Sequence, residues 1–225
     1  MKVSDLYANN PLRGQDCYII GSGPTIDLID QSVFVDRPCV LLNEAHKAMP
    51  GIGPIAFANN KKQLRDCVCP IQVVKGRLRF DPNPEQTDNH VPWDSEQYHV
   101  FSYRNPPWDK VSHHDDTQLW KEPDFYWAPK DGSVSAFAIQ FAVLCGAKSI
   151  TLAGCDCCHF GGKEYADECR RKMIVAHNYE RYAVGIMRLK RECKRLGIPL
   201  NTLSPFAGFG REQEQFPLLE ALWRK

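Results

Sequence analysis

The sequence predicts an α/β fold of the Rossmann-like type, in which helices cover both faces of a mostly parallel sheet. One observation is that short apolar runs alternate with helical stretches, a pattern typical of successive β-α-β units. Another is that these runs are apolar throughout instead of alternating with polar residues, as expected for parallel strands buried on both faces. With 225 residues, of which 43% are hydrophobic, the chain is expected to form a single domain over residues 1–225.

The expected strands are, in chain order, 18–20, 39–42, 55–58, 71–74, 150–153 and a weaker 199–203. The first strand leads into Gly21-Ser22-Gly23, and Pro24 then suits the first turn of a helix. Glycines let other atoms approach the backbone, and the free N–H groups of a helix start attract anions. The turn lacks the third small residue of a dinucleotide fingerprint and the Gly-Lys-Ser/Thr of a P-loop. It therefore either binds a phosphate or simply joins a strand to a helix.

Two helices are predicted from apolar residues that recur along one helical face. The first spans 133–145, where apolar residues follow the i, i+3, i+4, i+7 spacing, and Ser133 is its expected N-cap. The second runs from about 170 to 196, and Gly197 followed by Pro199 is typical of a helix end.

Residues 76–129 lack this periodicity and are rich in Pro, Trp, His and Asp, and only 98–103 has the composition of a strand. Long irregular segments of compact domains are usually functional or poorly ordered. We expect this stretch to be an irregular insertion that acts as a lid.

Composition indicates a cytoplasmic protein. No window approaches the roughly 18 apolar residues of a membrane span, and the N-terminus lacks a secretory apolar region. Several of the 10 cysteines lie inside apolar runs, where reduced cysteine behaves as a small hydrophobe. The net charge of +1 does not by itself indicate a nucleic-acid partner. We expect no membrane partner.

Polar residues follow nearly every predicted strand. They are Gly21-Ser22-Gly23, Asn43, Asn59-Asn60, Asp156 and Ser204. Ligands of open parallel sheets bind outside the carboxyl ends of the strands. An asparagine there offers a donor and an acceptor without bringing charge to an anionic ligand. One such residue only indicates a turn, but the set predicts a ligand site.

These residues carry a resemblance to a known group of proteins. The GSGPT turn, Asn43, Asn59 and the block GSVSAFAIQFAVLCGAKSITLAGCD at 132–156 resemble the donor domain of family 42 sialyltransferases. They are equally similar to domain-of-unknown-function 115 proteins, which include Maf-type flagellin-modifying glycosyltransferases and an archaeal hydroxymethylpterin diphosphokinase. The similarity covers residues 15–75 and 130–205.

The resemblance to the sialyltransferases implies a nucleotide-sugar donor, an acceptor with a free hydroxyl, no essential metal or other cofactor, and a histidine as general base. The implied donor contacts are Ser22, Asn43, Asn59, Gly132 and Ser133, with Tyr165 near the phosphate, and the implied general base is His177. Gly21, Gly23 and Asp156, which follow predicted strands, are further donor-binding candidates. The chain departs from the family at Cys157 and Cys158, where aromatic residues are expected beside the nucleotide. This departure leaves the nucleobase and the sugar of the donor unidentified.

Two histidines and one lysine are candidates for the site on chemical grounds, apart from the resemblance. Imidazole is the side chain best able to take a hydroxyl proton near neutral pH, which suits His177, although that residue also suits a helix surface. His159 and Lys163 are candidates for phosphate contact, or are simply solvated.

A metal site is the main alternative for residues 155–159, but a strand is expected to end at this cluster, which makes its spacing poor for a metal. Four adjacent residues, such as those at 113–116, also rarely converge on one ion. The sequence also has no DxD or clear carboxylate pair of the kind that places Mg²⁺. This favours glycosyl transfer over an ATP-dependent diphosphokinase of the hydroxymethylpterin type. A non-catalytic nucleotide-binding module stays open as well.

The acceptor is not determined by the sequence. The second helix carries Arg181, Arg188, Arg191 and Arg195 on one face, and single-strand binders combine such charge with aromatic residues. Nucleic acid is therefore a possible partner, as in phage-type glycosyltransferases that modify a hydroxylated DNA base. An ordinary solvated helix face is the simpler interpretation.

Overall fold

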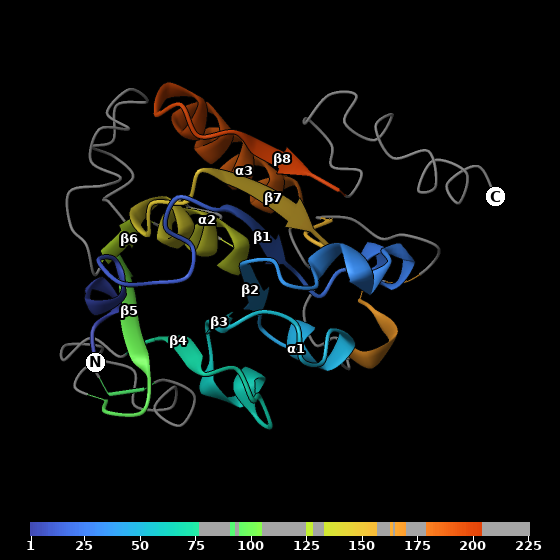
Figure 1. The fold of residues 1–225 in the computed structure, drawn as a ribbon, viewed down its shortest axis with the longest axis horizontal. Coiled ribbons are helices and arrows are strands. Elements are labelled where there is room, and N and C mark those ends of the chain that lie inside the picture. Colours follow the sequence, from blue (N-terminus) through green and yellow to red (C-terminus); the bar gives the residue numbers. More distant parts are fainter. Residues whose placement is uncertain are drawn as a thin grey trace.

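A computed structural model describes residues 1–76, 91–92, 95–104, 125–127, 133–156, 163, 165–169 and 179–203. Within this part of the chain the strands form one sheet in the order β6-β5-β4-β3-β2-β1-β7-β8, and all seven neighbouring pairs are parallel (Figure 1). The strands are β1 (Asp16–Ile20), β2 (Cys39–Leu42), β3 (Ile55–Ala58), β4 (Ile71–Lys75), β5 (His99–Arg104), β6 (Phe125–Trp127), β7 (Ser149–Ala153) and β8 (Leu200–Thr202). The predicted α/β class and parallel sheet are confirmed.

The helices are of two kinds. The α-helices are α1 (Ala45–Ala48), α2 (Val134–Leu144) and α3 (Tyr179–Arg195), and the 3₁₀ helices are Val3–Leu6, Pro24–Leu28, Gln31–Phe34, Lys61–Leu64 and Asp167–Cys169. Both long predicted helices are present: Ser133 is the N-cap of α2, and Gly197 adopts φ +73° just after α3. The predicted start of the second helix, at about residue 170, lies outside the described residues. The expected helix at Pro24 is only a five-residue 3₁₀ helix.

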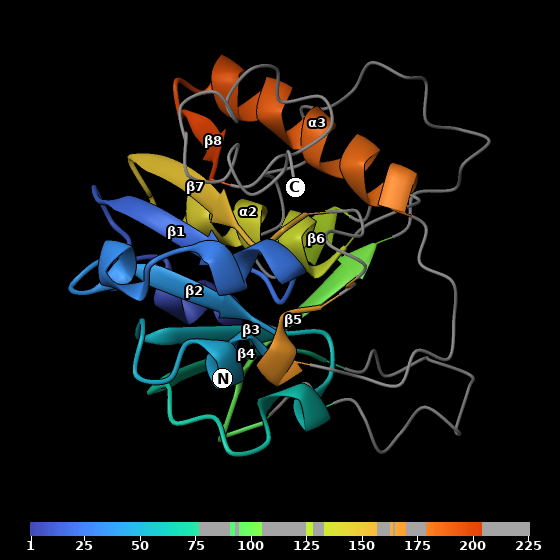
Figure 2. The ribbon, with the colours of Figure 1, turned by 90° about the vertical axis from the view of Figure 1, so that its right-hand side faces the viewer.

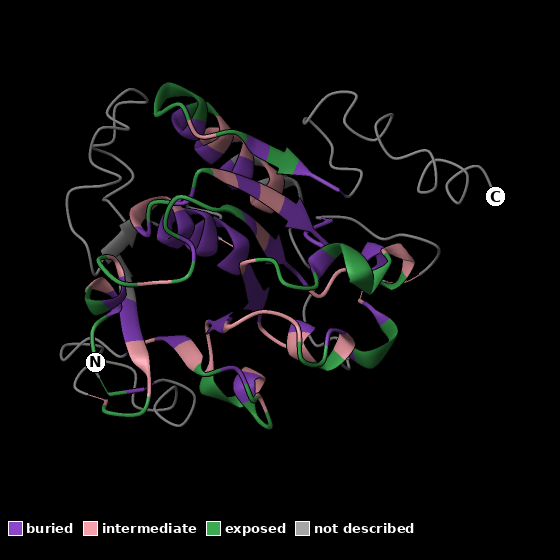
Figure 3. Cartoon of the chain, in the orientation of Figure 1, coloured by how far each residue is buried: buried purple, intermediate pink, exposed green. Residues whose placement is uncertain are grey.

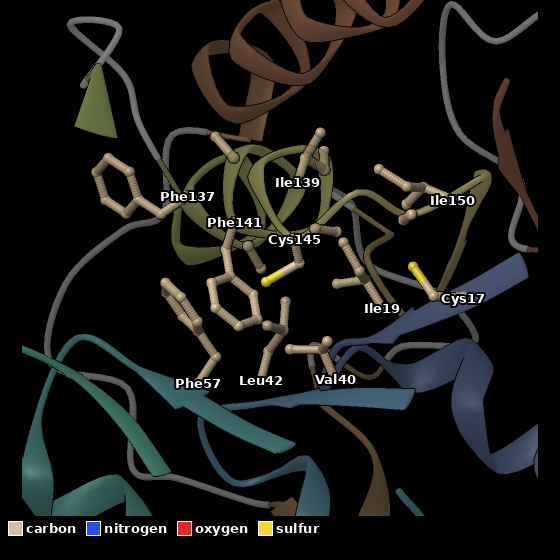
Figure 4. Packing of buried hydrophobic residues seen from close by; sticks show 14 of the residues in the cluster. Cys17, Ile19, Val40, Leu42, Phe57, Phe137, Ile139, Phe141, Cys145 and Ile150 are labelled. Carbon is tan, nitrogen blue, oxygen red and sulfur yellow. The ribbon is translucent and has the colours of Figure 1, made fainter. Parts of the chain in front are cut away.

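Both faces of the sheet are buried, because side chains alternate along each strand. On one face, here called the α2 face, β3 and β1 contribute Phe57 and Ile19 to a core shared with α2 and α3. Phe141 of α2 lies against Phe57 with ring centroids 5.6 Å apart (Figure 4). The other face, here called the α1 face, is covered by α1 and by the 3₁₀ helices other than Val3–Leu6, with Phe34 in its core. The 3₁₀ helix Val3–Leu6 packs on the α2 face. Figure 3 shows the buried residues concentrated in the central strands.

The described part of the stretch 76–129 is more regular than expected, and a role of this stretch as a lid stays a prediction. The strand expected at 98–103 is present as β5, and Phe125–Trp127 forms β6, a strand the sequence did not indicate. Both extend the sheet beyond β4, and the other residues of this stretch, apart from a few next to β4 and β5, lie outside the described ones. β6 was missed because three aromatic residues are too few to show a period.

The strand order places a change of direction between β1 and β7. The chain runs outward from β1 to β6, then returns through α2 to β7 on the other side of β1. The connection after β1 packs on the α1 face through Ile26, whereas α3, the helix that follows β7, packs on the α2 face through Ile186. Doubly wound proteins bind ligands at such a switch point, outside the carboxyl ends of the strands. Figure 2 looks from the side toward which β7 and β8 point in Figure 1.

Candidate functional site

The loops after β1 and β7 meet at the switch point. Gly23 N donates to Gly154 O at 2.8 Å, and Gly21 N donates to Ala153 O at 2.7 Å. A methyl group at Gly21 would lie 2.3 Å from Gly154 O, and one at Gly23 would lie 2.5 Å from both Gly154 O and Asp156 Oδ2. The two glycines are therefore required by the contact between the loops. Their contact with a donor stays a prediction.

Asp156 lies at the helix start after β1, where one of the two interpretations of the sequence places a phosphate. Its side chain is 4% exposed, and its Oδ2 accepts a hydrogen bond from the backbone N–H of Thr25 at 2.9 Å. Its Oδ1 accepts a second one from the Thr25 hydroxyl. Thr25 is itself fully buried, in the first turn of the 3₁₀ helix Pro24–Leu28. The carboxylate of Asp156 thus supplies the negative charge at this helix start. No feature of the sequence indicated Thr25 as its partner.

Asn43 and Asn59 both lie at the carboxyl edge, directly after the neighbouring strands β2 and β3. β2 pairs with β3 through Leu42 and Phe57, and Asn43 N donates to Phe57 O at 2.9 Å, so both asparagines follow the last paired residues. Asn43 has φ +52°, a left-handed conformation that asparagine tolerates better than most residues. The Oδ1 atoms of both are buried and accept no hydrogen bond. A buried acceptor without a partner costs about 1–3 kcal/mol.

Ser133 and Gln63 have the same unusual property. Ser133 caps α2 without a side-chain hydrogen bond, and its Oγ is buried with no partner. The chain reaches Ser133 from the carboxyl end of β6, so it lies at the same edge of the sheet. Gln63, in the 3₁₀ helix after β3, also has a buried Oε1 without a partner. Of the four such oxygens in the described part of the chain, the sequence indicated three, and nothing in it singled out Gln63.

Asn60 differs from its neighbour Asn59. Its Oδ1 accepts a hydrogen bond from Lys62 N at 2.8 Å and so caps the 3₁₀ helix Lys61–Leu64. The two adjacent asparagines after β3 therefore have different roles: one is satisfied within the protein, and the other is not.

The segment around Tyr165 docks on the loop after β1. Ala166 N donates to Ser22 O at 3.0 Å, and Tyr165 packs against the core of the α1 face. Lys163, a candidate for phosphate contact, has its ammonium 2.7 Å from Asp167 Oδ2 and 3.7 Å from Asp27 Oδ2. Two carboxylates thus compete with a phosphate for this charge. The segment therefore lies against the loop after β1, and contact of Ser22, Tyr165 or Lys163 with a donor stays a prediction.

The remaining predicted residues are placed as follows. Gly132, Cys157, Cys158, His159, His177 and Ser204 lie outside the described residues. On α3, Arg191 is exposed, but Arg195 Nε donates to Glu192 Oε2 at 2.9 Å, so part of the basic face is neutralised locally. Nucleic-acid contact through Arg181, Arg188, Arg191 and Arg195 stays a prediction.

Within the described residues, no three His, Cys, Asp or Glu side chains are grouped so as to hold a metal ion. The described helices include none that is both long and apolar enough to cross a membrane. A scan against protein-family models gives no match, and a search of curated proteins gives no match either.

Proposed function

We propose that the chain is a glycosyltransferase that binds a nucleotide sugar at the carboxyl edge of the sheet and transfers the sugar to an acceptor hydroxyl. Support comes from the switch point of the fold and from the resemblance to family 42 sialyltransferases and domain-of-unknown-function 115 proteins. The observation that carries the proposal is the set of buried acceptors without partners, the Oδ1 atoms of Asn43 and Asn59 and the Oγ of Ser133.

These atoms favour one part of the donor over another. A buried amide oxygen needs a hydrogen-bond donor, and a phosphate presents mainly acceptors. Sugar hydroxyls and the amino groups of bases are donors. We therefore assign Asn43, Asn59 and Ser133 to the sugar or base of the donor, and the resemblance adds Gly132. The resemblance implies that the leaving phosphate lies near Ser22 and Tyr165, outside the helix start that Asp156 fills, with Gly21, Gly23, His159 and Lys163 as further candidates.

The chemical step follows from the resemblance. His177 takes the proton of the acceptor hydroxyl as its oxygen attacks the anomeric carbon, and the nucleotide leaves with the electrons of the broken bond. We expect no metal requirement, since the sequence has no DxD or carboxylate pair and Asp156 is engaged by Thr25. The acceptor is a glycan, a protein, a pterin or a hydroxylated DNA base.

Two adjacent asparagines provide a matched test. Thermal unfolding is measured with CMP, UDP, GDP, ADP, ATP and their sugar conjugates, because a ligand that binds only the native state raises the midpoint. In Asn59→Ala the ligand-induced shift should be lost, while the free protein is as stable as wild type or more so, because an unsatisfied acceptor is removed. Asn60→Ala should keep the shift and lose about 1 kcal/mol, because its cap is removed.

An unchanged shift in Asn59→Ala would show that Asn59 does not face the ligand. For turnover, His177→Ala should bind nucleotide and transfer about 10²-fold to 10⁴-fold more slowly, and chelation should leave most activity. Stabilisation by ATP alone, with an absolute Mg²⁺ requirement, would favour the diphosphokinase instead. Binding without any turnover would favour a nucleotide-binding module.

A further inference from the structure

His46, in the short helix α1 after β2, contacts two backbone carbonyl oxygens. Its Nδ1 lies 3.1 Å from Asn43 O, and its Nε2 lies 3.2 Å from Arg65 O. Asn43 belongs to the turn after β2, and Arg65 is the C-cap of the 3₁₀ helix Lys61–Leu64 after β3. The half-buried imidazole ring therefore bridges the segments that follow two neighbouring strands.

The two contacts determine which protonation state of the ring fits. A carbonyl oxygen can only accept a hydrogen bond, so both ring nitrogens have to donate. A neutral imidazole carries hydrogen on one nitrogen, and its other nitrogen would face a carbonyl oxygen with lone pair against lone pair. Only the imidazolium satisfies both contacts. The bridge is therefore complete when His46 is charged, and it loses one of its two hydrogen bonds when His46 is neutral.

The bridged segments carry three of the four buried oxygens that have no partner in the described part of the chain. Asn43 Oδ1 lies on the first segment, and Asn59 Oδ1 and Gln63 Oε1 lie on the second. The contact of His46 with Asn43 O holds the left-handed backbone of Asn43, at φ +52°, and this backbone sets the direction of the Asn43 side chain. The bridge thus fixes how the three oxygens are presented together.

Charged or titratable residues lie on every segment that contacts α1 or His46. They are Glu44 and Lys47 on its own segment, Lys61, Lys62, Arg65, Asp66 and Cys67 after β3, Asp167, Glu168 and Cys169 in the 3₁₀ helix that touches Glu44, and Asp30 beside the 3₁₀ helix that touches Ala48. Glu44 pairs with Lys47 at 3.3 Å, and Asp167 pairs with Lys163 at 2.7 Å. Among the described residues no carboxylate forms an ion pair with His46, so the two carbonyl oxygens are what favour its charged form.

We propose that His46 is a positioning residue of the proposed donor site, which as an imidazolium bridges the turn after β2 and the segment after β3. The inference rests on the proposed function, because that function assigns Asn43 and Asn59 to the sugar or base of a nucleotide sugar. The bridge is complete at acidic pH and is lost as the pH rises through the range in which imidazole loses its proton, about pH 5–8. The donor therefore binds more weakly at alkaline pH.

The bridge itself is tested without nucleotide, by urea unfolding of the full chain at about pH 5.5 and about pH 8. His46→Gln keeps a polar side chain of similar length that does not titrate. The unfolding equilibrium constant of His46→Gln, divided by that of the wild type, should fall by about 3-fold to 10-fold between the two pH values, the range of one net hydrogen bond. It falls because the wild type loses its extra hydrogen bond as the ring becomes neutral.

His99→Gln is the matched control. His99 Nδ1 lies 3.2 Å from Lys2 O, and this single carbonyl oxygen is satisfied by a neutral ring with its hydrogen on Nδ1. The same ratio for His99→Gln should therefore change by less than about 2-fold between the two pH values.

The effect on the donor site is tested with CMP-N-acetylneuraminic acid, UDP-glucose and GDP-mannose. These conjugates lack the phosphate monoester that titrates near pH 6. For a conjugate that binds, the dissociation constant of the wild type should be about 3-fold to 10-fold higher at about pH 8 than at about pH 5.5. This rise should persist in His99→Gln and be absent from His46→Gln.

Three results would overturn the proposal. The first is a His46→Gln unfolding ratio that changes with pH no more than the His99→Gln ratio, which would mean that the charged ring forms no bridge. The second is a wild-type dissociation constant that is equal at both pH values, a measurement that needs no variant. The third is a rise that persists in His46→Gln. If no conjugate binds at either pH, the proposed function fails together with the positioning role, while the urea comparison still decides whether the bridge exists.

Discussion

Removing the carboxylate of Asp156 should destabilise the protein, because this side chain joins the loops after β1 and β7. Asp156→Ala removes the two hydrogen bonds that this carboxylate accepts from the buried N–H and hydroxyl of Thr25. Hydrogen bonds to a charged group contribute about 1.5–3 kcal/mol each, so the two together contribute about 3–6 kcal/mol. The substitution also removes the cost of burying a charge, which places the expected loss at the lower end, about 3 kcal/mol.

Urea unfolding of a double-mutant cycle measures this contribution. Thr25→Val removes the hydroxyl and keeps the backbone donor, so it should cost about 1–2 kcal/mol in the wild-type background. In the Asp156→Ala background the same change should cost little, because the hydroxyl has already lost its acceptor. The expected coupling energy is therefore about 1–2 kcal/mol.

Asp16 provides the matched control at the opposite end of the same two strands. It also accepts a serine hydroxyl, from Ser149 at 2.7 Å, but it is exposed to solvent. Asp16→Ala should change the urea midpoint only slightly. If Asp156→Ala proves no more destabilising than Asp16→Ala, or if the cycle shows no coupling, the assignment of Asp156 to the loop contact is wrong.

Two further predictions concern the same loops and the core. Gly23→Ala should lower the free energy of unfolding in urea by about 1–3 kcal/mol, because its methyl group would lie 2.5 Å from Asp156 Oδ2. An unchanged urea midpoint would mean that the loops after β1 and β7 move apart without cost. Burial raises the pKa of Cys17 to about 12, so its alkylation at pH 8 should follow global unfolding along a urea series, and modification in the native protein would contradict this.

The strands and helices that could be predicted from the sequence were recognised from the pattern of apolar residues within each segment. Each of the six predicted strands is present, because a continuous apolar run is stable only where both faces of a strand are covered. Helix α2 was recognised from its periodicity, although it is buried on more than the predicted face because α3 packs against its outer side. β6 was missed, since three residues carry no period.

The candidate site was only partly predictable. The positions of Asn43, Asn59 and Asp156 after strands were visible in the sequence, because polar residues there interrupt apolar runs. Their partners were not visible. Asn59 and Asn60 are the same residue type at adjacent positions. The Oδ1 of Asn60 accepts a hydrogen bond from a backbone N–H, whereas the buried Oδ1 of Asn59 has no partner.

The sequence by itself determined that this chain forms a parallel α/β sheet and that polar residues gather at the carboxyl ends of its strands, because burial and periodicity act between near neighbours along the chain. Only the tertiary structure decided that Asp156 meets Thr25, 131 positions away, and that Asn43 and Asn59 are left with unsatisfied oxygens. A hydrogen bond forms only where donor and acceptor lie about 3 Å apart in the right direction. That distance depends on how separate strands and loops pack together.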